Sequence, residues 1–99
     1  MVYEAEVRFP RAYADITGIY GYISEHNAMA ARSVIRQIRT TSRLLARYPG
    51  LGRDTDIPGV RVFPTARYPY LLYHRVHADE LVILHVRDGR RDSPREREL

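Results

Sequence analysis

Basic side chains that could do chemistry are concentrated in one stretch of the chain, residues 61–91. Within it, histidine and arginine alternate with aliphatic residues, a pattern that predicts β-strands carrying basic side chains. A histidine there suits general acid–base work, because its unperturbed pKa lies near neutral pH. Arginine presents a planar group of N–H donors that matches phosphate and carboxylate oxygens. The candidates are His85 as acid or base, and Arg61, Arg87, Arg90 and Arg91 as anion-binding cations.

Each candidate also has a purely structural interpretation. His85 lies between apolar neighbours and could be a histidine at the rim of a sheet. Arg61 lies between two valines on a short strand, where it either binds a partner or faces solvent. The last arginines have Asp88 and Asp92 as local counterions. An exposed pair of that kind contributes only about 0–1 kcal/mol, which favours target binding for this cluster.

Residues that hold metals or cofactors are sparse. The chain has no cysteine, so disulfides and thiolate metal sites are excluded. His74 and His77 are close in sequence, but no carboxylate-rich spacing accompanies them. The segment Gly50-Leu51-Gly52 is typical of a helix stop rather than of a phosphate-binding loop. We therefore expect neither a metal nor another cofactor.

Length and charge limit the class of protein. Ninety-nine residues predict a single domain over 1–99, with a disordered polar tail at 93–99. All sixteen basic residues are arginine and the net charge is +4. The pI near 9.8 favours an acidic partner, either nucleic acid or an acidic protein. Without a signal peptide or a long apolar run, we expect a cytoplasmic protein that does not enter a membrane.

Periodicity predicts the elements that position these residues. Alternation over 3–9 indicates a half-buried strand, and apolar residues at helical spacing over 12–23 indicate a helix. Gly18 and Gly21 would let a second helix approach this one closely. That second helix is expected over 28–47, with Asn27 as its N-cap. The remaining elements are strands over 60–63, 70–76 and 81–87, the last two joined by a turn at 77–80.

The order β-α-α-β-β-β predicts an α+β fold, an antiparallel sheet with a helical hairpin packed on one face. The last strand is apolar on both faces, so the uncovered face should be partly apolar, rimmed with arginine and suited to a partner. The second helix adds an arginine stripe with no acidic residue over 28–53. The stripe is either a solvated face or a binding surface. Binding is considered because no acidic residue at i,i+4 spacing offsets the arginine charges. It consists of Arg32, Arg36, Arg39, Arg43 and Arg47.

Segments that follow one another along almost the whole chain resemble the RelE/ParE superfamily of bacterial type II toxins, and the element order does too. The Tyr-Pro-Tyr strand and the Pro-Gly-Leu-Gly-Arg turn are more similar to ParE-like members. The segments are Ala14–Ile23 with Asn27–Ala30, Pro49–Arg53, Gly59–Arg61 with Tyr68–Tyr73, and Val82–Val86 with Gly89–Asp92.

The resemblance implies a growth-inhibiting toxin, encoded beside an antitoxin that silences it and serving plasmid or chromosome stability. RelE-like members cut mRNA on the ribosome, whereas ParE-like members inhibit DNA gyrase. RelE-like nucleases place an arginine where this chain has Tyr70, and they carry a late tyrosine, but none follows Tyr73 here. A C-terminal arginine does match, at Arg90 or Arg91. The resemblance thus favours gyrase inhibition, with a ribosome-dependent mRNA endonuclease or a degenerate toxin that only binds antitoxin as alternatives.

On this interpretation the candidate residues fall into two groups. Gyrase would be bound by Arg61, Arg87, Arg90 and Arg91, and a nuclease would use the same arginines with His85. An acidic, partly disordered antitoxin segment would fold onto the open sheet face or the helical hairpin and form a hetero-oligomer. The residues expected to bind it are Tyr70, Tyr73, Arg75, Ile83, Arg36 and Arg39.

Overall fold

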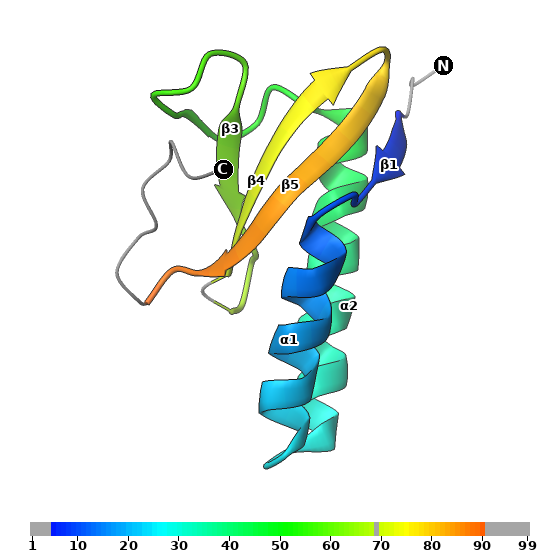
Figure 1. Ribbon diagram of the computed structural model, residues 1–99, viewed down its shortest axis with the longest axis vertical. Helices are drawn as coiled ribbons and strands as arrows, with labels where there is room; N and C mark the ends of the chain where they lie inside the picture. The colour runs from blue at the N-terminus through cyan, green and yellow to red at the C-terminus, as the bar shows by residue number, and fades with distance from the viewer. Residues whose placement is uncertain (1–4, 69, 91–99) are drawn as a thin grey trace.

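The chain forms two helices and a five-stranded sheet, which confirms the expected α+β fold. The computed structural model describes residues 5–68 and 70–90 (Figure 1). Tyr3, Arg91 and the tail expected at 93–99 lie outside the described residues. The elements are β1 (Glu6–Arg8), α1 (Ala12–Ser24), α2 (Ala28–Arg47), β2 (Arg53–Asp54), β3 (Arg61–Pro64), β4 (Tyr70–His77) and β5 (Glu80–Asp88).

The two helices form a hairpin whose turn lies well beyond the end of the sheet (Figure 1). α2 begins where expected, because the Asn27 side chain accepts a hydrogen bond from the Ala30 N–H at 3.0 Å. Its buried residues recur at helical spacing, and the five arginines of its stripe are exposed. Over the described residues, neither helix has the length and apolar character needed to cross a membrane.

The expectation that the α1 glycines let a second helix approach closely is wrong. A Cβ added at Gly18 or Gly21 would meet no atom within 4 Å. α1 packs against the core through Ile16, Ile19 and Ile23 instead. Gly18 borders a surface groove, so the space beside it is open to a partner.

The sheet is antiparallel from β2 to β5, as expected, and one parallel strand completes it in the order β1-β5-β4-β3-β2. β1 pairs in parallel with β5 only as far as Arg8 and Val82. The two-residue strand β2, which the sequence pattern did not predict, pairs with β3. The β4–β5 turn is tight, because Ala78 and Asp79 both adopt positive φ, 48° and 62°. Beyond Val82, no described strand pairs with the outer edge of β5.

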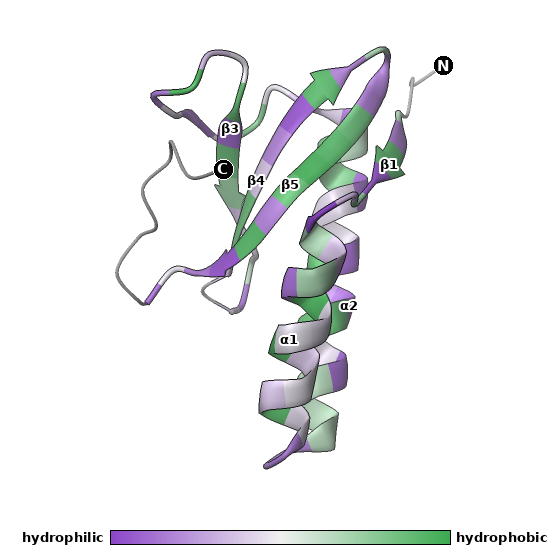
Figure 2. Cartoon of the chain, viewed as in Figure 1, coloured by the Kyte–Doolittle hydropathy of each residue, from purple (hydrophilic) through white to green (hydrophobic). Residues whose placement is uncertain are grey.

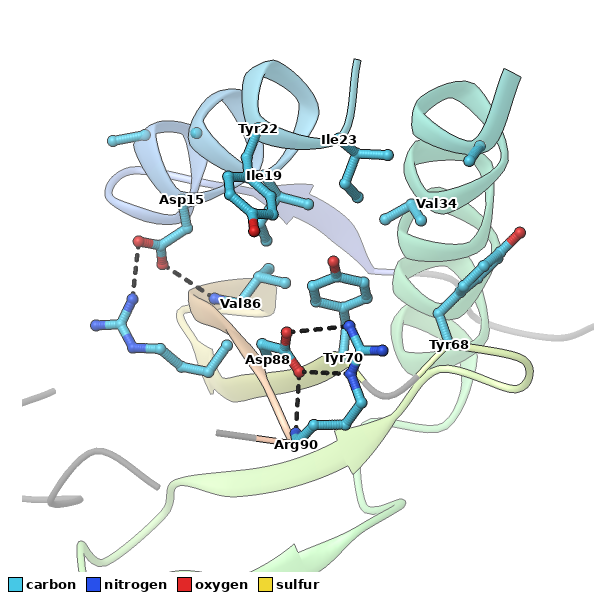
Figure 3. A pocket seen from close by; sticks show the side chains of 14 residues that line it. Asp15, Ile19, Tyr22, Ile23, Val34, Tyr68, Tyr70, Val86, Asp88 and Arg90 are labelled. Carbon is cyan, nitrogen blue, oxygen red and sulfur yellow. Dashed lines mark hydrogen bonds and ion pairs between the residues drawn. The ribbon is translucent and has the colours of Figure 1, made fainter. Parts of the chain in front are cut away.

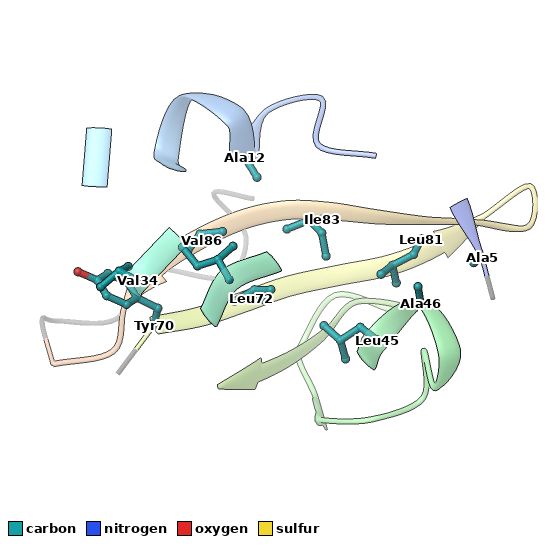
Figure 4. Packing of buried hydrophobic residues seen from close by; sticks show 11 residues of the cluster. Ala5, Ala12, Val34, Leu45, Ala46, Tyr70, Leu72, Leu81, Ile83 and Val86 are labelled. Atoms are coloured by element: carbon teal, nitrogen blue, oxygen red, sulfur yellow. The ribbon is translucent and has the colours of Figure 1, made fainter. Parts of the chain in front are cut away.

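A single core lies between the sheet and the hairpin. Leu72, Ile83 and Val86 project into it from β4 and β5, and Val34 and Leu45 project from α2 (Figure 4). Much of β5 is hydrophobic in Figure 2. Ile83 and Val86 are an odd number of residues apart, yet both face the helices. The irregularity in the β4–β5 register between them makes this possible, since an extra residue reverses the alternation of side chains.

The expectation of an exposed apolar patch on the opposite face is wrong for the centre of that face. Val62 pairs with Tyr73, and Tyr73 with His85, so their side chains form one row across the sheet. Val62 is 4% and Tyr73 1% exposed, although neither belongs to the core beneath the helices. The centre of this face therefore offers a partner no exposed apolar surface.

A candidate binding groove beside the end of the sheet

A groove of about 900 Å³ lies between the helical hairpin and the end of the sheet (Figure 3). It exists because the hairpin extends past the strands (Figure 1), which leaves apolar helix residues without a strand opposite them. The groove has an apolar floor, and charged side chains from α1 and the end of β5 form its rim. Lining residues include Gly18, Ile19, Tyr22, Val34, Tyr70 and Val86.

One carboxylate organises the rim. Asp15 of α1 accepts hydrogen bonds from the backbone N–H of Val86 at 3.0 Å and from the guanidinium of Arg87 at 2.8 Å (Figure 3). Nδ1 of His85 lies 3.0 Å from the same carboxylate. The three groups belong to consecutive residues on the free edge of β5. Asp15 therefore replaces the missing neighbouring strand for Val86 and fixes the side chains on either side of it.

A second carboxylate holds the other rim cation. Asp88 accepts hydrogen bonds from the backbone N–H of Arg90 at 2.9 Å and from its guanidinium at 3.3 Å. Hydrogen bonding to Asp88 raises the pKa of the Arg90 guanidinium. Both described rim arginines are thus paired with an aspartate of this chain, so the rim is balanced in charge. An apolar floor inside a balanced rim suits the apolar side chains of a partner segment.

Sequence reasoning identified Arg87, Arg90 and His85 but missed Asp15. The signal was present, because an acidic residue stands at the edge of the apolar stripe of α1, beside Ile16 and Ile19 in helical projection. A carboxylate that close to a core implies a buried donor partner. The donors lie 70 to 72 residues further along the chain, so no local pattern could name them.

The structure does not bring the candidate nuclease residues together. Arg61 pairs in register with His74, whereas His85 belongs to the row of Val62 and Tyr73. Alternation along β3 therefore puts Arg61 and His85 on opposite faces of the sheet. Arg61 donates to the carbonyl of Gly52 at 3.1 Å and lies 3.5 Å from Asp54.

His74, another histidine of these strands, has a structural position. It is fully buried, and its Nδ1 lies 3.1 Å from the carbonyl oxygen of Leu72. Burial lowers the pKa of its ring below 6.5, which keeps the ring neutral at neutral pH. Among the described candidates, only His85 and Arg87 therefore share a site, where both contact the Asp15 carboxylate.

The residues expected to bind antitoxin are dispersed. Tyr70 lines the groove. Ile83 and Tyr73 are 0% and 1% exposed, so neither presents a surface to a partner. Ile83 faces the helices together with Leu81, two residues before it on β5, and both belong to the core. Arg75 is exposed on β4.

Arg36 and Arg39 lie on the outer side of α2, away from the groove. At about 100° per residue, they fall roughly opposite Ala30 and Val34, the residues that α2 contributes to the groove. Both arginines are exposed.

Across residues 5–68 and 70–90, no group of three or more histidine, cysteine or acidic side chains is placed to hold a metal ion.

Comparison with known proteins identifies the family. Residues 9–93 match the family model described as the ParE toxin of the type II toxin-antitoxin system, parDE. The chain is 30% identical over 79 residues to toxin ParE3 of Caulobacter vibrioides, with 77% of each protein covered. It also resembles a solved chain of the chromosomal ParDE TA system from P. aeruginosa, with a TM-score of 0.74 and 27% identity over 87% of this chain and 97% of that one. The resemblance to the RelE/ParE superfamily, closer to ParE, is confirmed. The chain belongs to the ParE toxin family of type II toxin–antitoxin systems.

Proposed function

We propose that this protein inhibits growth by binding DNA gyrase in the cytoplasm, and that a cognate antitoxin neutralises it by seating a segment in the groove. Membership of the ParE family supports the toxin–antitoxin role. The observation that carries the proposal is the groove itself. Its floor is apolar, and Arg87 and Arg90, two of the residues expected to contact the target, lie on its rim.

Neutralisation then follows from occlusion. A segment that places apolar side chains against Ile19, Tyr22 and Ile23 also covers the rim arginines. The toxin can therefore bind its target or its antitoxin through this region, but not both. A disordered segment that folds as it binds suits a groove of this kind, because it can follow a long surface and gain affinity from a few buried anchors.

Filling the groove tests where the antitoxin sits. Gly18→Trp places an indole where the glycine now leaves open space, and the helix loses no contact. We expect this variant to remain toxic, while its affinity for the product of the adjoining antitoxin gene falls about 100-fold. Isothermal titration calorimetry measures the affinity, and co-expression in bacteria measures rescue from toxicity.

Gly21→Trp is the matched control. Gly21 is also on α1 with open space beside it, but it does not line the groove. This variant should bind antitoxin as the unmodified protein does. If both tryptophan variants bind equally well, the groove is not the antitoxin site.

The geometry favours inhibition by binding over RNA cleavage. Cleavage through a 2′-hydroxyl needs an acid, a base and cations that converge on one phosphate. Here Arg61 and His85 are on opposite faces, and Arg87 and Arg90 are each bonded to a carboxylate. These positions support a protein-binding role for the rim.

One paired assay tests the target. The chain is expressed without antitoxin, gyrase supercoiling is then measured, and mRNA 5′ ends are mapped in the same cells. We expect the supercoiling activity of gyrase to fall at least tenfold while mRNA remains intact. In-frame mRNA cuts with normal supercoiling would replace gyrase inhibition with ribosome-dependent cleavage. Normal growth would indicate a degenerate toxin that only binds antitoxin.

A further inference from the structure

The outer side of α2 carries a row of cations that neither the core nor the groove uses. Arg32, Arg36, Arg39 and Arg43 are all exposed. None of the four side chains makes a hydrogen bond or ion pair with a residue in the described part of the chain. At about 100° per residue they fall within an arc of roughly 60°. At about 1.5 Å per residue the row is roughly 17 Å long.

We propose that this row, the α2 arginine row, binds the phosphate backbone of duplex DNA. Its length corresponds to about five nucleotides of one DNA strand at about 3.4 Å per nucleotide. A rigid helix presents the cations in a line, and each guanidinium can donate two hydrogen bonds to a phosphate. Such contacts carry no sequence information, so the binding is expected to be independent of base sequence.

The composition of this face favours DNA over an acidic protein. In helical projection, the arc from Arg39 to Arg36 contains no α2 residue other than the four arginines. Protein partners gain most of their affinity from buried aromatic or aliphatic anchors. None lies within this arc, and the exposed Met29 falls just outside it. Single-stranded nucleic acid is bound through aromatic stacking. The row itself contains no aromatic residue, and the exposed Tyr48 borders it only at the Arg43 end. A strip of cations alone suits the regular phosphates of a duplex.

This inference does not rest on the gyrase proposal. It uses a surface on the side of α2 away from Ala30 and Val34, which line the groove, so both sites can be occupied together. It also gives Arg36 and Arg39 a phosphate ligand in place of the antitoxin contact that the sequence pattern suggested.

Fluorescence anisotropy tests the proposal on the full chain, separated from antitoxin, with a labelled 24-base-pair duplex of arbitrary sequence. The R36Q/R39Q/R43Q variant should bind the duplex at least tenfold more weakly in 50 mM NaCl. Its slope of log affinity against log salt should fall by about two to three, since each phosphate contact contributes about 0.9. Circular dichroism checks the fold of every variant.

The control variant R8Q/R53Q/R67Q removes the same net charge from exposed arginines outside the row. It should bind within threefold of the unmodified chain, with the same salt slope. If both variants lose the same affinity for the duplex, the effect is explained by net charge alone, which would overturn the proposal. Absence of duplex binding would also overturn it, and so would tighter binding of poly-glutamate or of single-stranded DNA. If a triple variant does not fold, Arg39→Gln against Arg67→Gln repeats the comparison, with a slope difference of about one.

Discussion

Replacing Asp15 with alanine is expected to lower the free energy of unfolding by about 2–4 kcal/mol. The carboxylate accepts hydrogen bonds from Val86 and Arg87 and lies beside His85. The side chains of Asp15 and His85 are 19% and 14% exposed, so water replaces the lost acceptor only in part. Hydrogen bonds to a charged group contribute about 1.5–3 kcal/mol each, and breaking a shielded ion pair leaves the partner cation uncompensated.

Urea denaturation followed by circular dichroism measures this loss. Glu25→Ala is the matched control, because Glu25 is an exposed carboxylate directly after the same helix. Its effect should stay within about 0.5 kcal/mol. Asp15→Asn should fall between the two, since an amide oxygen still accepts from the Val86 N–H but has no charge to offer Arg87. Equal stabilities of the Asp15→Ala and Glu25→Ala variants would show that the contact between α1 and β5 contributes nothing.

Features encoded by neighbouring residues were predictable from the sequence. The Asn27 cap and the helical spacing of apolar residues predicted α2 with the bounds that the structure shows, Ala28–Arg47. The turn between β4 and β5 and both of its strands were also found to within one residue at each end. In each case the determining interactions lie within a few residues along the chain.

Features set by contacts between distant segments were not predictable. The sequence pattern could not show that β1 lies parallel to β5, or that this pairing ends at Val82 and leaves an edge for Asp15. The irregularity at Tyr73 and His74 reverses the alternation of β5 after Ile83, so that Val86 joins Leu81 and Ile83 in the core beneath the helices. The prediction of the candidate site was incomplete for the same reason. Its residue types were identified, but their faces and counterions depend on the register.

The glycines after α2 provide the second large expected effect. Gly52→Ala should lower the free energy of unfolding by about 3–5 kcal/mol, because two costs combine there. Gly52 has φ +101°, and an added Cβ would lie 2.4 Å from the Val62 carbonyl oxygen and 2.9 Å from its carbon. A non-glycine residue in such a conformation costs about 1–3 kcal/mol, and the backbone of β3 cannot move away without losing its pairing with Arg53.

Two other glycines separate these costs. Gly50 has open space and no positive φ, so Gly50→Ala should change stability by less than about 0.5 kcal/mol. Gly59 has φ +81° but nothing within 4 Å, so Gly59→Ala should cost only the strain, about 1–2 kcal/mol. The difference between the Gly52 and Gly59 variants then measures the clash alone. Hydrogen exchange at the Thr55 amide, which donates to Val60 at 3.1 Å, should accelerate in the Gly52 variant if the clash opens the β2–β3 connection. Equal losses at Gly52 and Gly59, with Thr55 still protected, would mean that the connection shifts freely and that close backbone approach does not explain the second glycine of the Pro-Gly-Leu-Gly-Arg turn.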